Sequence, residues 1–420
     1  MLERIGQWVR IGKMGRNTLV GSAGLGFRAL LQAGYLIALT RLLGPDNYGL
    51  LAGCVAAATL LAPLSGWGAG YVFLEKVSRD RSMGGGIWAS VLIQTFVSGA
   101  MLAAVMVALG LAMSLRVGLL ELGLLAMAEL IALPMAQAAT LALMSQERGV
   151  MASIVLCLVP AGRLVGVLSL VLLGVPVAVD TVVLMHFVGS AVGALLAALF
   201  VGYAVAWPDW AARMMLRKSA SEGTRYAVGS LVATSYPESD KVLILQLLGA
   251  NAAGQYTAAF RIVSVFVLPI AALINAALPR LFVQAGSDGK GSVLRAITVA
   301  ALAYAVFAAV LSIAAAPWMP LLFGEAYTPA IPLVGMLSAW IPLVALHQCG
   351  ASALTSGGLQ SSRVVIEAVG LVAIVVLNML LLPALGIVGA VWSLLAVEAF
   401  LALACWAVQL TRGRKLNPSG

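Results

Sequence analysis

The sequence predicts an all-α polytopic membrane protein with about twelve transmembrane helices in two six-helix bundles. The 420-residue chain is 62% hydrophobic and 10% charged, whereas soluble domains are about one quarter charged. Apolar runs of about 20 residues, enough to cross a bilayer, recur from end to end. A glycine turn also occurs twice, because Gly44 and Gly49 of L-L-G-P-D-N-Y-G match Gly249 and Gly254 of L-L-G-A-N-A-A-G. Such an internal repeat is common in transporters.

The expected helices follow the apolar runs in chain order. In the first half they cover about 17–43, 48–74, 85–114, 117–145, 150–174 and 181–206. In the second half they cover about 226–248, 254–282, 293–316, 328–356, 360–383 and 386–410. Several exceed the spanning minimum, so we expect tilts or kinks. The first is too long for a cleaved signal sequence, which predicts an uncleaved span.

The distribution of basic residues predicts the orientation. Most of the 25 Lys and Arg residues fall on the side of the N-terminus if the spans alternate in direction. Because basic loops stay in the cytoplasm, an even number of spans with both termini inside is expected. The net charge of +9 then marks a face that lies against anionic lipid. It does not indicate nucleic-acid binding.

The same pattern predicts the domain organisation. Residues 1–206 form an N-terminal six-helix bundle, and residues 226–420 form a C-terminal one with a short cytoplasmic tail. Residues 207–225, the longest and most basic inner loop, are the expected cytoplasmic linker.

Soluble-enzyme and cofactor motifs are missing from the sequence. The four cysteines are isolated and have no metal-ligand spacing. His186 and His347, the two histidines, share no motif, and we expect each to be a packed or hydrogen-bonded residue rather than a proton relay. A Walker sequence is absent as well, which argues against ATP-driven transport by this chain alone. The sequence therefore predicts neither a metal nor a resident cofactor.

Charged and polar residues inside the spans are the informative exceptions. Such a charge costs about 2.5–3.5 kcal/mol at the bilayer centre, so it faces protein or water and usually has a function. The residues concerned are Arg28, Glu238, Asp240, Lys241, Arg261, Asn378 and Glu398.

Depth along the helices predicts how these charges pair, because residues equally far from a hairpin turn lie level with each other. Arg28 has no partner nearby in sequence, which favours a cavity role; for Arg261 a structural role and a binding role both stay open. The expected pairs are Asp240–Arg261, Glu238–Lys241, Glu129–Arg163 and Arg363–Glu367.

Two segments carry a family resemblance. The turn L-T-R-L-L-G-P-D-N-Y-G-L-L-A at 39–52 resembles the hallmark of polysaccharide-synthesis export proteins, the lipid-linked oligosaccharide flippases of the multidrug/oligosaccharidyl-lipid/polysaccharide (MOP) exporter superfamily. The segment from Asp240 to Ile262 resembles their second signature. The resemblance implies a V of two bundles around a central cationic cavity. It also implies a non-enzymatic flippase that moves an undecaprenyl-diphosphate-linked O-antigen or exopolysaccharide repeat unit across the bacterial inner membrane.

The implied cargo suggests roles for the intramembrane residues. Arg28 and Arg261 would clamp the diphosphate oxygens, and Gln32 and Lys241 would add polar contacts. The resemblance also implies coupling to a Na⁺ or H⁺ gradient or to the membrane potential. The expected partners are the lipid-linked oligosaccharide, anionic lipids and other glycan-assembly proteins. The residues implied for a coupling ion are Asp240, Glu238, Asn378 and Glu398.

Two other functions remain open. A cation-coupled drug or metabolite exporter of the same superfamily would share the architecture, but it would favour an acidic cavity for cationic drugs. A membrane enzyme of glycan assembly usually presents its site in long outer loops, and every expected outer loop here is short.

Overall fold

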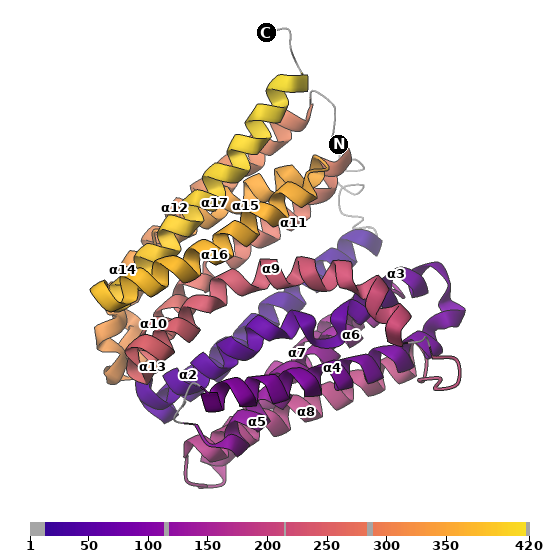
Figure 1. Cartoon of the computed structure of the whole chain (residues 1–420), viewed down its shortest axis with the longest axis horizontal. Helices are drawn as coiled ribbons and strands as arrows, with labels where there is room; N and C mark the ends of the chain where they lie inside the picture. The colour runs from indigo at the N-terminus through magenta and orange to yellow at the C-terminus, as the bar shows by residue number, and fades with distance from the viewer. Residues whose placement is uncertain (1–12, 113–116, 214–215, 284–288, 417–420) are drawn as a thin grey trace, which may run out of the picture. The chain divides into compact units, whose positions relative to one another are not determined.

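The computed structural model describes residues 13–112, 117–213, 216–283 and 289–416, and the regular structure in these ranges is helical (Figure 1). The first part holds α2 (Lys13–Leu61), α3 (Ala69–Arg79), α4 (Gly84–Ala112), α5 (Leu119–Met127), α6 (Leu133–Met144), α7 (Gly149–Leu172) and α8 (Val179–Ala204). The second holds α9 (Leu216–Leu248), α10 (Ala250–Val265), α11 (Leu268–Val283), α12 (Gly289–Ala315), α13 (Met319–Phe323), α14 (Ile331–Leu337), α15 (Trp340–Ser356), α16 (Gln360–Leu385) and α17 (Ile387–Leu416).

The helices confirm a polytopic all-α membrane fold. Among the described residues, eight segments are long and apolar enough to cross a bilayer, or ten if each of two bent pairs is one span. One of these segments, Gly24–Arg79, contains both arms of the first hairpin. The charged helix α9, which carries Glu238, Asp240 and Lys241, is not among the ten. If the two arms of the first hairpin are counted separately and α9 is added, the ten become the predicted twelve spans.

The repeated turns have the same backbone conformation. Gly44 has φ 67° and ψ 176°, and Gly249 has φ 90° and ψ 178°, a region that only glycine enters without strain. Each residue therefore breaks the helix at the apex of a hairpin. The internal repeat that the sequence suggested is thus a repeated structural element.

The two turns also pack against each other. Asn251 Nδ2 donates a hydrogen bond of 2.9 Å to Asp46 Oδ2. A Cβ atom on Gly49 would clash with the Ala250 carbonyl oxygen, and one on Gly254 would clash with the Pro45 carbonyl oxygen. Matching residues of the two turns thus make reciprocal backbone contacts, which require glycine on both sides.

The helices pack into two compact units. Unit 1 comprises residues 1–39 and 61–231, and unit 2 comprises residues 40–60 and 232–420. In unit 1, α7 and α8 pack along their lengths, and in unit 2 α17 packs along both α15 and α16 (Figure 1). Packing therefore divides both α2 and α9 between the units, whereas the repeat-based division at 206 and 226 stays a prediction.

Helix α9 begins at Leu216, ten residues before the expected start at 226, so half of the expected linker is helical. Contacts with α3 and the segment before it hold this extension in unit 1. Lys76 Nζ lies 2.7 Å from Glu222 Oε2, and Trp67 Nε1 donates to Thr224 Oγ1 at 2.9 Å. Tertiary contacts thus stabilise a helix in a polar segment whose composition suggests a loop.

Irregular segments interrupt two spans of unit 1. Residues Ala62–Gly68 form a distorted 3₁₀ segment between α2 and α3, and Ala128–Ala132 form a π-helical turn between α5 and α6. Ser65 Oγ donates to the Leu130 carbonyl oxygen, which joins the two segments. Backbone irregularity within a membrane is tolerated when protein satisfies the freed groups, as here. The π-helical turn carries Glu129, and such turns often mark functional positions.

Candidate functional site

Arg28 lies on α2 in unit 1 and is half-buried. Its Nε atom is shielded from solvent and has no hydrogen-bond partner among the described residues. The ionisable groups near it include the Cys157 thiol and the guanidinium of Arg163. Gln32 is four residues further along, so it shares this helix face, and it is exposed. The expectation that Arg28 has no local partner agrees with this geometry.

A buried polar network occupies the interior of unit 1. Tyr35 OH lies 2.6 Å from His186 Nδ1, and His186 Nε2 lies 2.9 Å from Glu129 Oε1. Arg163 NH2 lies 2.9 Å from the same Glu129 oxygen, and Arg163 Nε donates to Ser190 Oγ at 2.8 Å. The predicted Glu129–Arg163 pair is confirmed. His186 is hydrogen-bonded, as expected.

The charged residues of α9 and α10 form a second cluster, in unit 2. Lys241 is fully buried, with Nζ 3.1 Å from Asp240 Oδ1 and 3.5 Å from Glu238 Oε2. It also lies 3.9 Å from the centre of the Phe260 ring, a cation–π contact. The predicted Glu238–Lys241 pair is therefore present. Protein groups surround Lys241, and its role in substrate binding stays a prediction.

The predicted Asp240–Arg261 pair is wrong. Asp240 is fully buried and binds Lys241 and the Tyr256 hydroxyl, which donates to Oδ2 at 2.5 Å. Arg261 instead lies 3.6 Å from Glu238 Oε1, and its side chain is 41% exposed. Arg261 therefore combines a carboxylate partner with access to its surroundings, which keeps both of its predicted roles open.

A third cluster surrounds Glu398 on α17, which is fully buried. Its Oε2 accepts hydrogen bonds from Tyr236 OH at 3.0 Å and Trp340 Nε1 at 2.9 Å. Its Oε1 lies 2.6 Å from His347 Nδ1. Asn378 is buried separately on α16, where its amide nitrogen donates to the Ile374 carbonyl oxygen. The predicted coupling residues thus lie in one unit but bind different partners.

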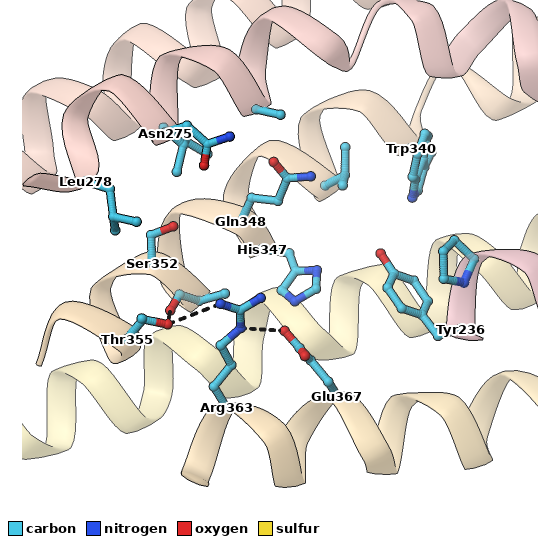
Figure 2. Close-up of a pocket in the computed structure, with 15 residues that line it drawn as sticks. Tyr236, Asn275, Leu278, Trp340, His347, Gln348, Ser352, Thr355, Arg363 and Glu367 are labelled. Atoms are coloured by element: carbon cyan, nitrogen blue, oxygen red, sulfur yellow. Dashed lines mark hydrogen bonds and ion pairs between the residues drawn. The ribbon is translucent and has the colours of Figure 1, made fainter. Parts of the chain in front are cut away.

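A polar cavity of about 370 Å³ lies beside this third cluster, within unit 2. Figure 2 shows His347 at its wall, with Asn275 of α11 opposite α15. Arg363 closes one side, with Nε 2.6 Å from Glu367 Oε1 and NH1 3.1 Å from Thr355 Oγ1 (Figure 2). The predicted Arg363–Glu367 pair is therefore confirmed.

Sequence reasoning missed this cavity. The sequence pattern that could have indicated the cavity is a row of polar residues on the otherwise apolar helix α15, at Gln348, Ser352 and Thr355. These positions are spaced four and three residues apart, which places them on one helix face.

The fold is that of known transporters. An inward-facing multidrug resistance MATE family transporter of the MOP superfamily superposes with a TM-score of 0.77 at 15% identity, covering 94% of this chain and 96% of the other. An outward-facing structure of such a transporter gives 0.65 at 15% identity, with 97% and 96% covered. A MATE protein in complex with MaL6 gives 0.62 at 13% identity, again with 97% and 96% covered. A comparison with curated proteins found no match.

The fold and the buried charges thus define a polytopic membrane protein with a MATE-like architecture. The sequence model of a family described as polysaccharide biosynthesis protein matches residues 14–284. The chain belongs to this polysaccharide biosynthesis protein family.

Proposed function

We propose that the chain is a flippase that moves an undecaprenyl-diphosphate-linked oligosaccharide across the bacterial inner membrane by alternating access. The observation that carries the proposal is Arg28, a half-buried guanidinium whose shielded Nε has no protein partner among the described residues. Membership of a polysaccharide biosynthesis family supplies the context. Both termini are placed in the cytoplasm by the positive-inside rule.

An anionic lipid headgroup is the ligand that this site fits best. Buried polar groups are rarely left unsatisfied, and a planar guanidinium binds two phosphate oxygens at once. Gln32, on the same face of α2, offers an amide to the phosphate or the first sugar. Arg261 keeps its proposed role as a phosphate contact, because its side chain is 41% exposed beside Glu238.

The rest of the cargo needs little from the protein. The prenyl chain can remain in the bilayer, since transfer of apolar groups from lipid to protein gains little. The transport step breaks no covalent bond, so we assign the chain no enzymatic activity and no resident cofactor. Anionic lipids would contact the basic inner face, and other glycan-assembly proteins are proposed as partners.

A transport assay tests the proposal. The full chain would be reconstituted in liposomes with an undecaprenyl diphosphate that carries a dithionite-quenchable fluorescent sugar. Losing a charge-assisted hydrogen bond costs about 1.5–3 kcal/mol, so Arg28→Ala should slow flipping about 10- to 100-fold. Arg28→Lys should restore only part of the rate.

The matched control is Arg148→Ala, because Arg148 is exposed and its side chain bonds only to Met151 Sδ among the described residues. It should flip at the wild-type rate. An Arg28→Ala protein that is well folded and fully active would refute the proposed role of Arg28. Absence of flipping by the wild-type chain would refute the function.

A cation-coupled drug exporter is the second candidate, favoured by the match to multidrug transporters. The flippase would carry an anionic cargo, whereas the drug exporter would carry a cationic one. Ethidium transport without flipping of the diphosphate lipid would establish the second function in place of the first.

A further inference from the structure

Each unit contains one network of a tyrosine, a histidine and a glutamate. In unit 1 these residues are Tyr35, His186 and Glu129. In unit 2 they are Tyr236, His347 and Glu398. The chain has two histidines in total, and both bond to a buried glutamate within the membrane.

The two networks occupy matching helices of the predicted repeat. Each tyrosine belongs to the first predicted span of its half, on α2 or α9. In unit 1 the glutamate is on the fourth span and the histidine on the sixth, whereas in unit 2 these two residue types are exchanged. The repeat therefore supplies a natural comparison between two versions of one arrangement.

Unit 1 holds the version with a permanent charge. Arg163 lies 2.9 Å from the Glu129 oxygen that also contacts His186. Arginine does not deprotonate in proteins, so Glu129 has a constant cationic partner. Both nitrogens of His186 are also occupied, one by Tyr35 and one by Glu129. Proton exchange at His186 would therefore break hydrogen bonds that are already satisfied.

Unit 2 holds the version without that charge. Glu398 accepts hydrogen bonds from Tyr236, Trp340 and His347, none of which carries a permanent charge. His347 Nε2 is shielded from solvent and makes no hydrogen bond to the described residues. His347 also lines the polar cavity (Figure 2). One imidazole nitrogen thus contacts a carboxylate, while the other is buried near the Cys405 thiol of α17 and bonds to no charged group of the described residues.

The cavity provides a route for protons. It follows α15 from His347 to Thr355, eight residues or about 12 Å along the helix axis. Its amide and hydroxyl lining can hydrogen-bond water. Helices α11 and α12 face α15 with the neutral groups Asn275 and Thr298. The ionisable groups near the pair are Tyr236 and Asp240 of α9, Arg363 and Glu367 of α16, and Cys405 of α17.

We infer that His347 and Glu398 form a proton-binding site in unit 2, and that Glu129 and His186 form its non-exchanging counterpart in unit 1. A proton that arrives through the cavity binds the His347 imidazole and gives an imidazolium–carboxylate pair; its release restores the neutral imidazole. One part of this inference rests on the proposed function: if the chain is a flippase, the proton bound here is the ion that is coupled to transport.

Tyr236 connects this site to the chain crossing between units. Helix α9 leaves unit 1 and enters unit 2 at Val232, about one turn before Tyr236. The Tyr236 hydroxyl bonds directly to Glu398. A change of charge at His347 therefore acts on a carboxylate that holds α9 near this crossing.

Two histidines make the site accessible to NMR. The full chain would be labelled with ¹⁵N-histidine in lipid nanodiscs, and the imidazole shifts followed between about pH 5 and pH 10. His186→Gln and His347→Gln assign the two signals. We expect the His347 signal to titrate in this range and the His186 signal to stay constant. Glu398→Gln should shift the pH at which His347 titrates. Glu367→Gln, which changes the carboxylate that lines the cavity, should not.

The outcomes separate the inference from the proposed function. A His347 signal that does not titrate, or whose titration is unchanged in Glu398→Gln, overturns the inference, as does titration of both histidines alike. Transient currents after a pH jump on a solid-supported membrane, without any cargo, should be lost in His347→Gln; a persisting current also overturns it. Neither readout requires flipping, so a chain that titrates as expected but flips no diphosphate lipid would refute only the proposed function.

Discussion

Replacing Glu129 by Gln should destabilise the protein by about 3–5 kcal/mol, the cost of removing one partner of a buried ion pair. The side chain of Glu129 is 3% exposed and that of Arg163 is 14% exposed, so water can replace little of the lost interaction. In the variant the Arg163 guanidinium keeps its charge, with Ser190 Oγ as its remaining hydrogen-bond partner. His186 Nε2 would face an amide in place of a carboxylate.

The free energy of unfolding would be measured by titration with sodium dodecyl sulfate in mixed micelles, with tryptophan fluorescence as the signal. A double variant, Glu129→Gln with Arg163→Gln, should recover part of the loss, because it leaves no unpaired charge. The control is Arg79→Ala, since the Arg79 side chain is 79% exposed and its pair with Glu75 should contribute little. A loss below about 1 kcal/mol in Glu129→Gln would refute the argument that burial makes this pair strong.

Two further predictions concern the two hairpins that contain the glycine turns. Gly49→Ala should lower the melting temperature in detergent, because its Cβ would clash with the Ala250 carbonyl oxygen, whereas Gly335→Ala, which has open space around it, should not. Equal melting temperatures would contradict the close contact of the turns. In a double-mutant cycle of Arg261→Ala and Glu238→Gln, the stability coupling should be at most about 1 kcal/mol, because Arg261 is 41% exposed. Flipping should fall in both variants that lack Arg261, and normal flipping there would remove it from the cargo site.

Local pattern in the sequence predicted the features that depend on neighbours along the chain. Gly44 and Gly249 were identifiable because a repeated glycine marks a repeated backbone conformation. Depth along the helices correctly paired Glu129 with Arg163, although the π-helical turn at Glu129 makes its span locally irregular. The family signatures likewise lie in continuous segments.

Features that depend on the rotation of helices were not predictable in the same way. Depth places Arg261 level with Asp240 but does not say which side chains of α9 and α10 meet: Asp240 meets Tyr256, and Arg261 meets Glu238. The network of Glu398 joins α9, α15 and α17, whose mutual contacts no local pattern encodes. His347 was consequently expected to be a packed or hydrogen-bonded residue, and the sequence did not show that its partner is Glu398.

The reciprocal contact of the two glycine turns explains why so little of the repeat is still visible in the sequence. If the halves arose by duplication of one gene, most positions were free to diverge because each met different neighbours. Gly49 and Gly254 were not free to diverge, since each packs against the backbone of the other copy's turn and no larger residue fits there. Divergence would then have kept glycine where the backbone conformation requires it, at Gly44 and Gly249, and where one copy's turn packs against the other's.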